Sequence, residues 1–131
     1  MQATRFGSSY VELEGDIIHV HWVGLPTLAQ LQAVYAAVAE LLDQTGSRRV
    51  LFDVRAAGLP GAELRRYAAE WWRPRAHHVA LASYGMTLGV RVMMEMVRRA
   101  IELIGGGSAK MINCGTEAEA RAWLSRQPAG P

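Results

Sequence analysis

The sequence predicts an α/β fold, a five-stranded mixed sheet with four helices. Residues 9–14 and 17–23 alternate apolar and polar side chains around a Gly15-Asp16 pair, which is typical of a hairpin with one buried face. Residues 50–54, VLFDV, are almost continuously apolar, as in a parallel strand buried on both faces. Helical and extended patterns alternate after the hairpin, which favours βαβ units with right-handed crossovers.

Local signals place the individual elements. Glycine at the first turn position predicts a type II′ turn, and this register sets Val11 opposite Val20 and Glu12 opposite His19. Thr27 and Thr116 are each followed three residues later by Gln or Glu, the spacing of a capping box. The elements expected after the hairpin are a helix within 27–46, a strand at 50–54, a helix at 60–72, a strand at 77–83, a helix at 87–104, a strand at 110–114 and a helix from 116.

Composition is that of one globular domain. The chain has 131 residues, of which 50% are hydrophobic, and we expect a single domain at 9–126 between a flexible lead-in at 1–8 and a disordered tail at 127–131. The net charge of +2 is too small to indicate nucleic-acid binding. A single cysteine, no signal-peptide pattern and no membrane-length apolar run predict a cytoplasmic location.

Four motifs occur along this element order. They are the strand ending VLFDVR, the glycine-rich loop after Asp53, the Trp71-Trp72 pair at the end of the second helix, and GTEAEARAWL at 115–124. With them the chain resembles the STAS domain of anti-sigma-factor antagonists, most closely its SpoIIAA-like branch, which is related to CRAL-TRIO-type lipid-transfer domains. The resemblance covers residues 9–126 and implies a non-catalytic regulatory or ligand-sensing module in bacterial-type signalling. In that family a serine of this loop is phosphorylated, whereas residues 56–61 here read AAGLPG, so no phosphosite is predicted.

The loop after the strand at 50–54 is the main candidate site. Carboxyl ends of parallel strands share one edge of a sheet, where a helix N-terminus can also contribute to binding. We therefore expect a protein partner, or a second copy of the chain, to bind there. The simpler interpretation, that Asp53 satisfies local backbone donors and Arg55 is a solvated strand end, remains open. The candidate partner-binding residues are Asp53, Arg55, Gly58, Leu59, Pro60 and Gly61, and the other polar residues expected at this edge are Ser83, Tyr84, Asn113 and Cys114.

The helix expected at 87–104 carries a second candidate surface. Methionine side chains adapt to varied apolar partners, and an exposed apolar patch suits a dimer interface or a hydrophobic ligand. A cavity beneath this helix would make the chain a small hydrophobic ligand or lipid carrier, which is the alternative function. Ordinary core packing explains most of the same pattern. The residues of this patch are Val90, Met93, Met94 and Val97.

The histidines do not predict an enzyme. His19 and His21 share one strand face and could bind a metal with Glu12, but ordinary pairing on a wetter hairpin face explains them as well, and no metal or cofactor is predicted. His77 and His78 are expected at the opposite sheet edge from Cys114, so no cysteine–histidine pair is expected.

Arginines and aromatic residues are mixed at 65–75, as on many nucleic-acid-binding surfaces. At helical spacing, however, the aromatic residues face inward and the arginines outward. A solvated helix face therefore explains the segment, and no nucleic-acid partner is predicted.

Overall fold

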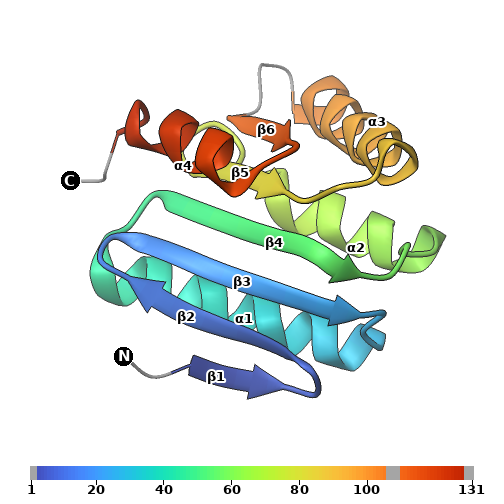
Figure 1. Cartoon of the computed structure of the whole chain (residues 1–131), viewed down its shortest axis with the longest axis horizontal. Coiled ribbons are helices and arrows are strands. Elements are labelled where there is room, and N and C mark those ends of the chain that lie inside the picture. The colour runs from blue at the N-terminus through green and yellow to red at the C-terminus, as the bar shows by residue number, and fades with distance from the viewer. Residues whose placement is uncertain (1–2, 106–109, 129–131) are drawn as a thin grey trace.

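A single mixed sheet organises the computed structural model, which describes residues 3–105 and 110–128 (Figure 1). Its six strands lie in sequence order from β1 to β6. β1 pairs with β2, and β2 with β3, in antiparallel fashion, whereas β3 to β6 pair in parallel, as predicted. The strands are β1 (Ala3–Phe6), β2 (Ser9–Glu14), β3 (Ile17–Gly24), β4 (Arg49–Ala57), β5 (Ala80–Tyr84) and β6 (Met111–Cys114).

The helices cover the two faces of the sheet unequally. They are α1 (Leu28–Thr45), α2 (Ala62–Trp72), α3 (Leu88–Gly105) and α4 (Glu117–Ser125). α1 packs on β1 to β3 and adjoins α2, which adjoins α3, whereas α4 packs on β4 to β6 from the opposite face. Figure 1 shows α4 in front of the sheet and α1 behind it. Within the described residues, no helix covers the front of β2 and β3, and none is long and apolar enough to cross a membrane.

The predicted hairpin register and the capping box at Thr27 are confirmed, whereas Thr116 caps its helix by accepting from the Glu119 backbone N–H without the reciprocal bond of a capping box. Val11 lies opposite Val20 and Glu12 opposite His19, and Gly15 has the positive φ of 62° that the tight turn requires. Thr27 forms the capping box with Gln30. These local signals were reliable because each depends on residues close together in the chain.

The predicted strand count is wrong, since the sheet has six strands and not five. Residues 3–6, expected within a flexible lead-in at 1–8, form β1 and pair with β2, with Thr4 opposite Val11. The segment ATRF buries little of its side chains, so it carries no apolar pattern by which a strand could be recognised. Its position is set by backbone hydrogen bonds to the free edge of β2.

The strand expected at 77–83 begins later, at Ala80. The backbone N–H groups of His78 and Val79 donate to the carbonyl of Arg75, at 3.1 and 2.9 Å, and so form a turn after α2. The two histidines therefore precede β5 instead of opening it. α2 starts at Ala62, two residues after the predicted start, because Gly61 is its N-cap. Parts of the predicted glycine helix stop and of the predicted tail, at 106–107 and 129–131, lie outside the described residues.

Aromatic rings between the sheet and α1 and α2 form the centre of the main core. The Tyr35 ring stacks on Trp71 at 4.6 Å and meets Phe52 and Trp72, with ring centroids 6.5 and 6.3 Å away. The indole Nε1 of Trp72 donates to Tyr35 Oη at 3.3 Å. Burial strongly raises the pKa of Tyr35, so its hydroxyl stays neutral. This bond satisfies the buried indole N–H and fixes α2 against α1.

Replacement of Tyr35 by Phe tests this contact. The Tyr35→Phe variant leaves the Trp72 indole N–H buried without its acceptor, which we expect to lower the free energy of unfolding by about 1–3 kcal/mol. Urea denaturation monitored by tryptophan fluorescence measures the change. Tyr67→Phe, in the same ring cluster, is the control and should cost less; equal losses in both variants would contradict the role assigned to the bond.

Candidate functional site

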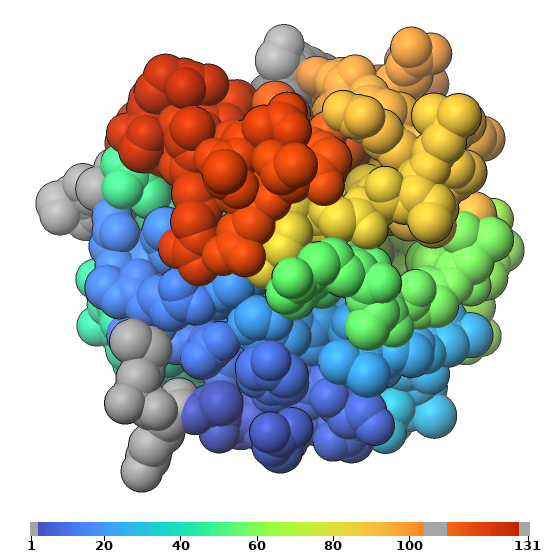
Figure 2. All heavy atoms as spheres, viewed as in Figure 1, coloured from blue at the N-terminus to red at the C-terminus, as the bar shows by residue number. Residues whose placement is uncertain are grey.

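The carboxyl ends of β3 and β4 and the start of α3 surround one apolar pocket of about 100 Å³. The backbone N–H of Gly58 donates to the carbonyl of Gly24 at 2.9 Å, so the loops that follow β3 and β4 lie together. In Figure 2 the loop after β4, in green, lies beside the connection from β5 to α3, in yellow. The pocket lining includes Leu25, Pro26, Gly58, Pro60, Met86, Val90, Met94 and Val97.

The loop and the helix patch, predicted as separate surfaces, therefore meet at this pocket. Gly58 and Pro60 contribute from the loop, and Val90, Met94 and Val97 contribute from α3. Leu59, 54% exposed, and Leu25, 56% exposed, are apolar side chains on the same loops. We call this region, comprising Leu25, Arg55, the loop at 58–61 and the pocket side of α3, the carboxyl-end surface.

Two residues of the predicted sets have mainly local roles. Gly61 caps α2 with extended backbone, and a Cβ at this position would meet no other atom within 4 Å. Met93 is half-buried and its sulfur lies 3.8 Å from the Arg65 guanidinium, whose Nη1 also donates to the Pro60 carbonyl at 2.8 Å. Arg65 thereby links the loop to α3.

Asp53 and Arg55 form a tight pair at the end of β4. Arg55 donates from Nε and Nη2 to the two carboxylate oxygens of Asp53, both at 3.0 Å, and its backbone N–H donates to Oδ1 at 3.1 Å. Burial alone would raise the pKa of Asp53, but the hydrogen bonds from Arg55 and His21 hold it well below its usual range. Asp53 is thus buried and engaged, while Arg55, with 63% of its side chain exposed, is available to a partner.

His19 and His21 are buried, which corrects the expectation of a wetter outer face. Their exposed fractions are 3% and 8%. Glu12 contacts His21 Nε2 at 2.7 Å instead of pairing with His19 directly across the ladder, and Glu14 contacts His19 Nδ1. The Tyr10 ring stacks on His21 at 4.3 Å, and Tyr84 Oη lies 2.9 Å from His19 Nε2. These neighbours cover most of both rings.

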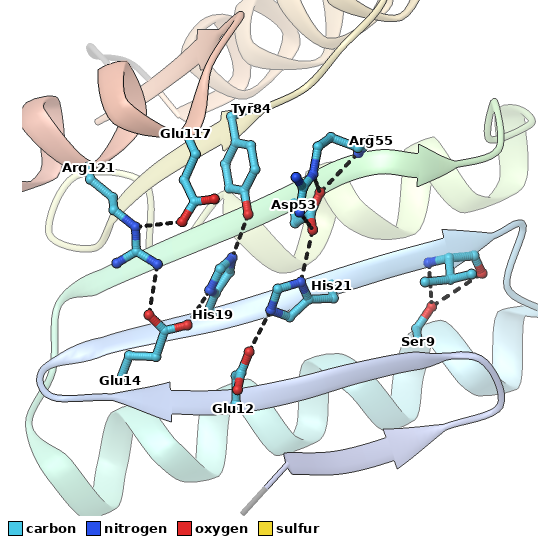
Figure 3. A network of polar contacts seen from close by, with 11 residues as sticks. Ser9, Glu12, Glu14, His19, His21, Asp53, Arg55, Tyr84, Glu117 and Arg121 are labelled. Carbon is cyan, nitrogen blue, oxygen red and sulfur yellow. Dashed lines mark hydrogen bonds and ion pairs between the residues drawn. The ribbon is translucent and has the colours of Figure 1, made fainter. Parts of the chain in front are cut away.

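α4 completes this polar network (Figure 3). Arg121 donates from Nη2 to Glu14 at 2.7 Å and from Nε to Glu117 at 2.8 Å. Burial lowers the pKa of His19 more than its contact with Glu14 raises it. Burial and the negative charges of Asp53 and Glu117 raise the pKa of Tyr84. The network therefore joins β2, β3, β4, β5 and α4 through one set of charged and aromatic groups.

The remaining polar residues expected at this edge have structural surroundings. Tyr84 lies between Asp53 and Cys114 in the parallel register. Burial raises the pKa of the Cys114 thiol, which is opposite to the activation that a nucleophile requires. Ser83 is buried, and Asn113 donates to Glu95 Oε1 of α3 at 2.8 Å.

The element order and sheet topology form a SpoIIAA-like fold, which is the fold that the resemblance implied. A crystal structure with this fold comes from an uncharacterized DUF3478-family protein of Shewanella loihica PV-4. It aligns with a TM-score of 0.61 and 14% identity, covering 95% of this chain and 98% of that chain. At that identity the likeness shows the fold alone. No protein-family model and no curated protein matches the sequence.

Gly85, which follows β5, allows Arg55 to reach Asp53. Its φ is 85°, and an added Cβ would lie 2.2 Å from Arg55 Cγ and 3.2 Å from the Arg55 backbone nitrogen. We expect Gly85→Ala to lower the free energy of unfolding by about 1–3 kcal/mol, through backbone strain and this overlap. Urea denaturation measures the effect.

Gly89→Ala is the matched control. Gly89 lies in α3, where a Cβ would meet no other atom within 4 Å, so alanine should leave stability unchanged or raise it by about 0.5–1 kcal/mol. A Gly85→Ala variant as stable as the wild type would contradict this role, because it would show that Arg55 can adopt another conformation without loss of stability.

Proposed function

We propose that the chain is a non-catalytic, regulatory protein-interaction module that binds its partner through the carboxyl-end surface. The observation that carries the proposal is the convergence of the loop at 58–61, the exposed leucines Leu25 and Leu59, and the pocket side of α3 on one apolar depression. Exposed apolar side chains grouped around a pocket are typical of protein interfaces.

The size of the pocket favours an inserted side chain over a whole ligand. Pockets for small molecules usually measure about 300–1,000 Å³, and a cavity of about 150 Å³ already accommodates benzene. The volume of about 100 Å³ here suits one apolar side chain of a partner. The hydrophobic-ligand carrier is therefore the weaker alternative, although Val90, Met94 and Val97 line the pocket as that alternative required.

A charged group at the same end of the sheet indicates what else a partner should carry. The Arg55 guanidinium is largely exposed, lies over the Tyr84 ring at 5.5 Å and is held in place by Asp53. Arg55 points to the face of β4 opposite Phe52 and Val54, which line the pocket. A partner that reaches both would therefore carry an aliphatic or aromatic anchor and, apart from it, a carboxylate. Because residues 56–61 contain no serine or threonine, we do not expect phosphorylation of this loop to control binding.

Loop substitutions test this proposal by co-purification. We expect Leu25→Asp and Leu59→Asp each to weaken partner binding at least about tenfold, or about 1.4 kcal/mol, by placing a charge at the pocket. Gly61→Asp adds charge to the loop without steric conflict, and aspartate is a favourable N-cap. Partners recovered from native lysate are identified by mass spectrometry, and their affinity is then measured with purified components.

Leu103→Asp is the matched control, because Leu103 is 86% exposed near the far end of α3. A partner that binds the wild type and this control equally, but the loop variants weakly, supports the proposal; equal binding to all variants would refute the placement. If light scattering shows a dimer that Leu59→Asp dissociates, the partner is a second copy. Native mass spectrometry that shows a bound small molecule, lost on denaturation, would favour the carrier instead.

A further inference from the structure

Four side chains on the front of β2 and β3 bring metal-binding atoms together. One ligand atom from each of Glu12, Glu14, His19 and His21 lies within 4.8 Å of all the others. The histidines are buried at 3% and 8% exposure, while the glutamate side chains remain 28% and 29% exposed, so the cluster has a protein floor and a side open to solvent. Two imidazole nitrogens and two carboxylate oxygens form a ligand set that suits Zn²⁺ and related ions.

The protein already holds His21 through Nδ1, the ring nitrogen that would not contact the ion. His21 Nδ1 lies 2.9 Å from Asp53 Oδ2, and both oxygens of Asp53 also accept from Arg55, so the carboxylate acts as acceptor and His21 Nδ1 as donor. In a neutral ring this leaves a lone pair on Nε2, which faces Glu12 Oε1 at 2.7 Å. Histidines that bind metals usually donate their other N–H to a carboxylate in this way.

His19 has the corresponding arrangement. Its Nε2 lies 2.9 Å from Tyr84 Oη. When Nε2 donates to the Tyr84 oxygen, the lone pair of Nδ1 faces Glu14. In these tautomers each ring presents a nitrogen lone pair toward a glutamate oxygen, as two ligands of one metal ion do.

Formal charge supports a cation at this place. The carboxylates of Glu12, Glu14, Asp53 and Glu117 outnumber the guanidinium groups of Arg55 and Arg121 by four to two. The ring centroids of His19 and His21 are 3.9 Å apart, so both rings can reach one ion. One divalent ion would offset the excess of negative charge at the glutamates.

We propose that Glu12, Glu14, His19 and His21 bind one divalent transition-metal ion, with Zn²⁺ as the reference ion. Tetrahedral Zn²⁺ with bonds of about 2.0–2.2 Å holds its ligand atoms about 3.3 Å apart. The four atoms, all within 4.8 Å, reach that spacing if the partly exposed glutamate side chains rotate so that the short contacts to the rings widen and the longer gaps close. Asp53 and Tyr84 act as positioning residues, because each holds a ring through its other nitrogen. The ion would also tie β2 to β3 at the open face.

Calorimetric titration with Zn²⁺ tests the site. The full chain is purified without a polyhistidine tag, treated with a chelator and titrated at neutral pH; we expect one ion per chain. Co²⁺ should bind at the same stoichiometry and give the visible absorption of a four-coordinate complex with nitrogen and oxygen ligands. Mg²⁺ should not compete, because it prefers six oxygen ligands. Absence of stoichiometric Zn²⁺ binding, or a six-coordinate Co²⁺ spectrum, would overturn the proposal.

Variants locate the ion. Glu12→Gln and His21→Gln should each weaken Zn²⁺ binding at least about tenfold, and Asp53→Asn, which removes the acceptor charge behind His21, about 10- to 100-fold. The paired substitution His77→Ala and His78→Ala, in the exposed turn before β5, is the matched control and should leave the affinity unchanged. Circular dichroism checks that each variant folds. If His21→Gln unfolds, Glu12→Gln still tests the site, because the Glu12 side chain is 28% exposed and its replacement disturbs the core less. Equal affinity in the ligand variants, or loss of binding in the control, would refute the assignment.

Discussion

The structure depends on the parallel pairing of β4 with β3 and β5. Leu51 and Phe52, adjacent in β4, point to opposite faces and anchor the two apolar clusters, one under α4 and the other under α1 and α2. The same register sets Asp53 beside His21 on one side and Tyr84 on the other. A shift by one residue would exchange the faces, placing Asp53 among the aromatic rings and Phe52 in the polar network.

The structural features that were predicted correctly depend on contacts between residues close in the chain or on periodic patterns of apolar residues. The hairpin register followed from alternation around Gly15, and the parallel direction of the last four strands followed from the alternation of helical and extended patterns. The order of the strands in the sheet was not predicted and comes from the structure. β1 was missed because its pairing with β2 is mainly a backbone interaction, and the four-residue segment ATRF is too short to show a periodicity. Sequence patterns record burial on a face, and in β1 only Phe6 is partly buried against the core.

The polar network escaped prediction for a different reason. Alternation correctly placed His19 and His21 on the face opposite the apolar residues, but it could not show that Tyr84 and Arg121, which are 65 and 107 residues from their partners His19 and Glu14, would enclose that face. The signal available in the sequence for this network was a pair of histidines, His19 and His21, across the hairpin from Glu12 and Glu14. Its interpretation required the fold, because only the fold shows that Asp53 lies behind His21.

Asp53 connects the two surfaces on which the functional proposals rest. One of its oxygens accepts from both His21 and Arg55, so the carboxylate holds a ring of the histidine cluster and the exposed guanidinium of the carboxyl-end surface. A substitution at Asp53 therefore alters both surfaces, whereas Leu59 belongs only to the loop and Glu12 only to the cluster. Because Asp53 lies in the central strand of the sheet, its position is fixed by the core, and the two surfaces keep a constant geometry relative to each other.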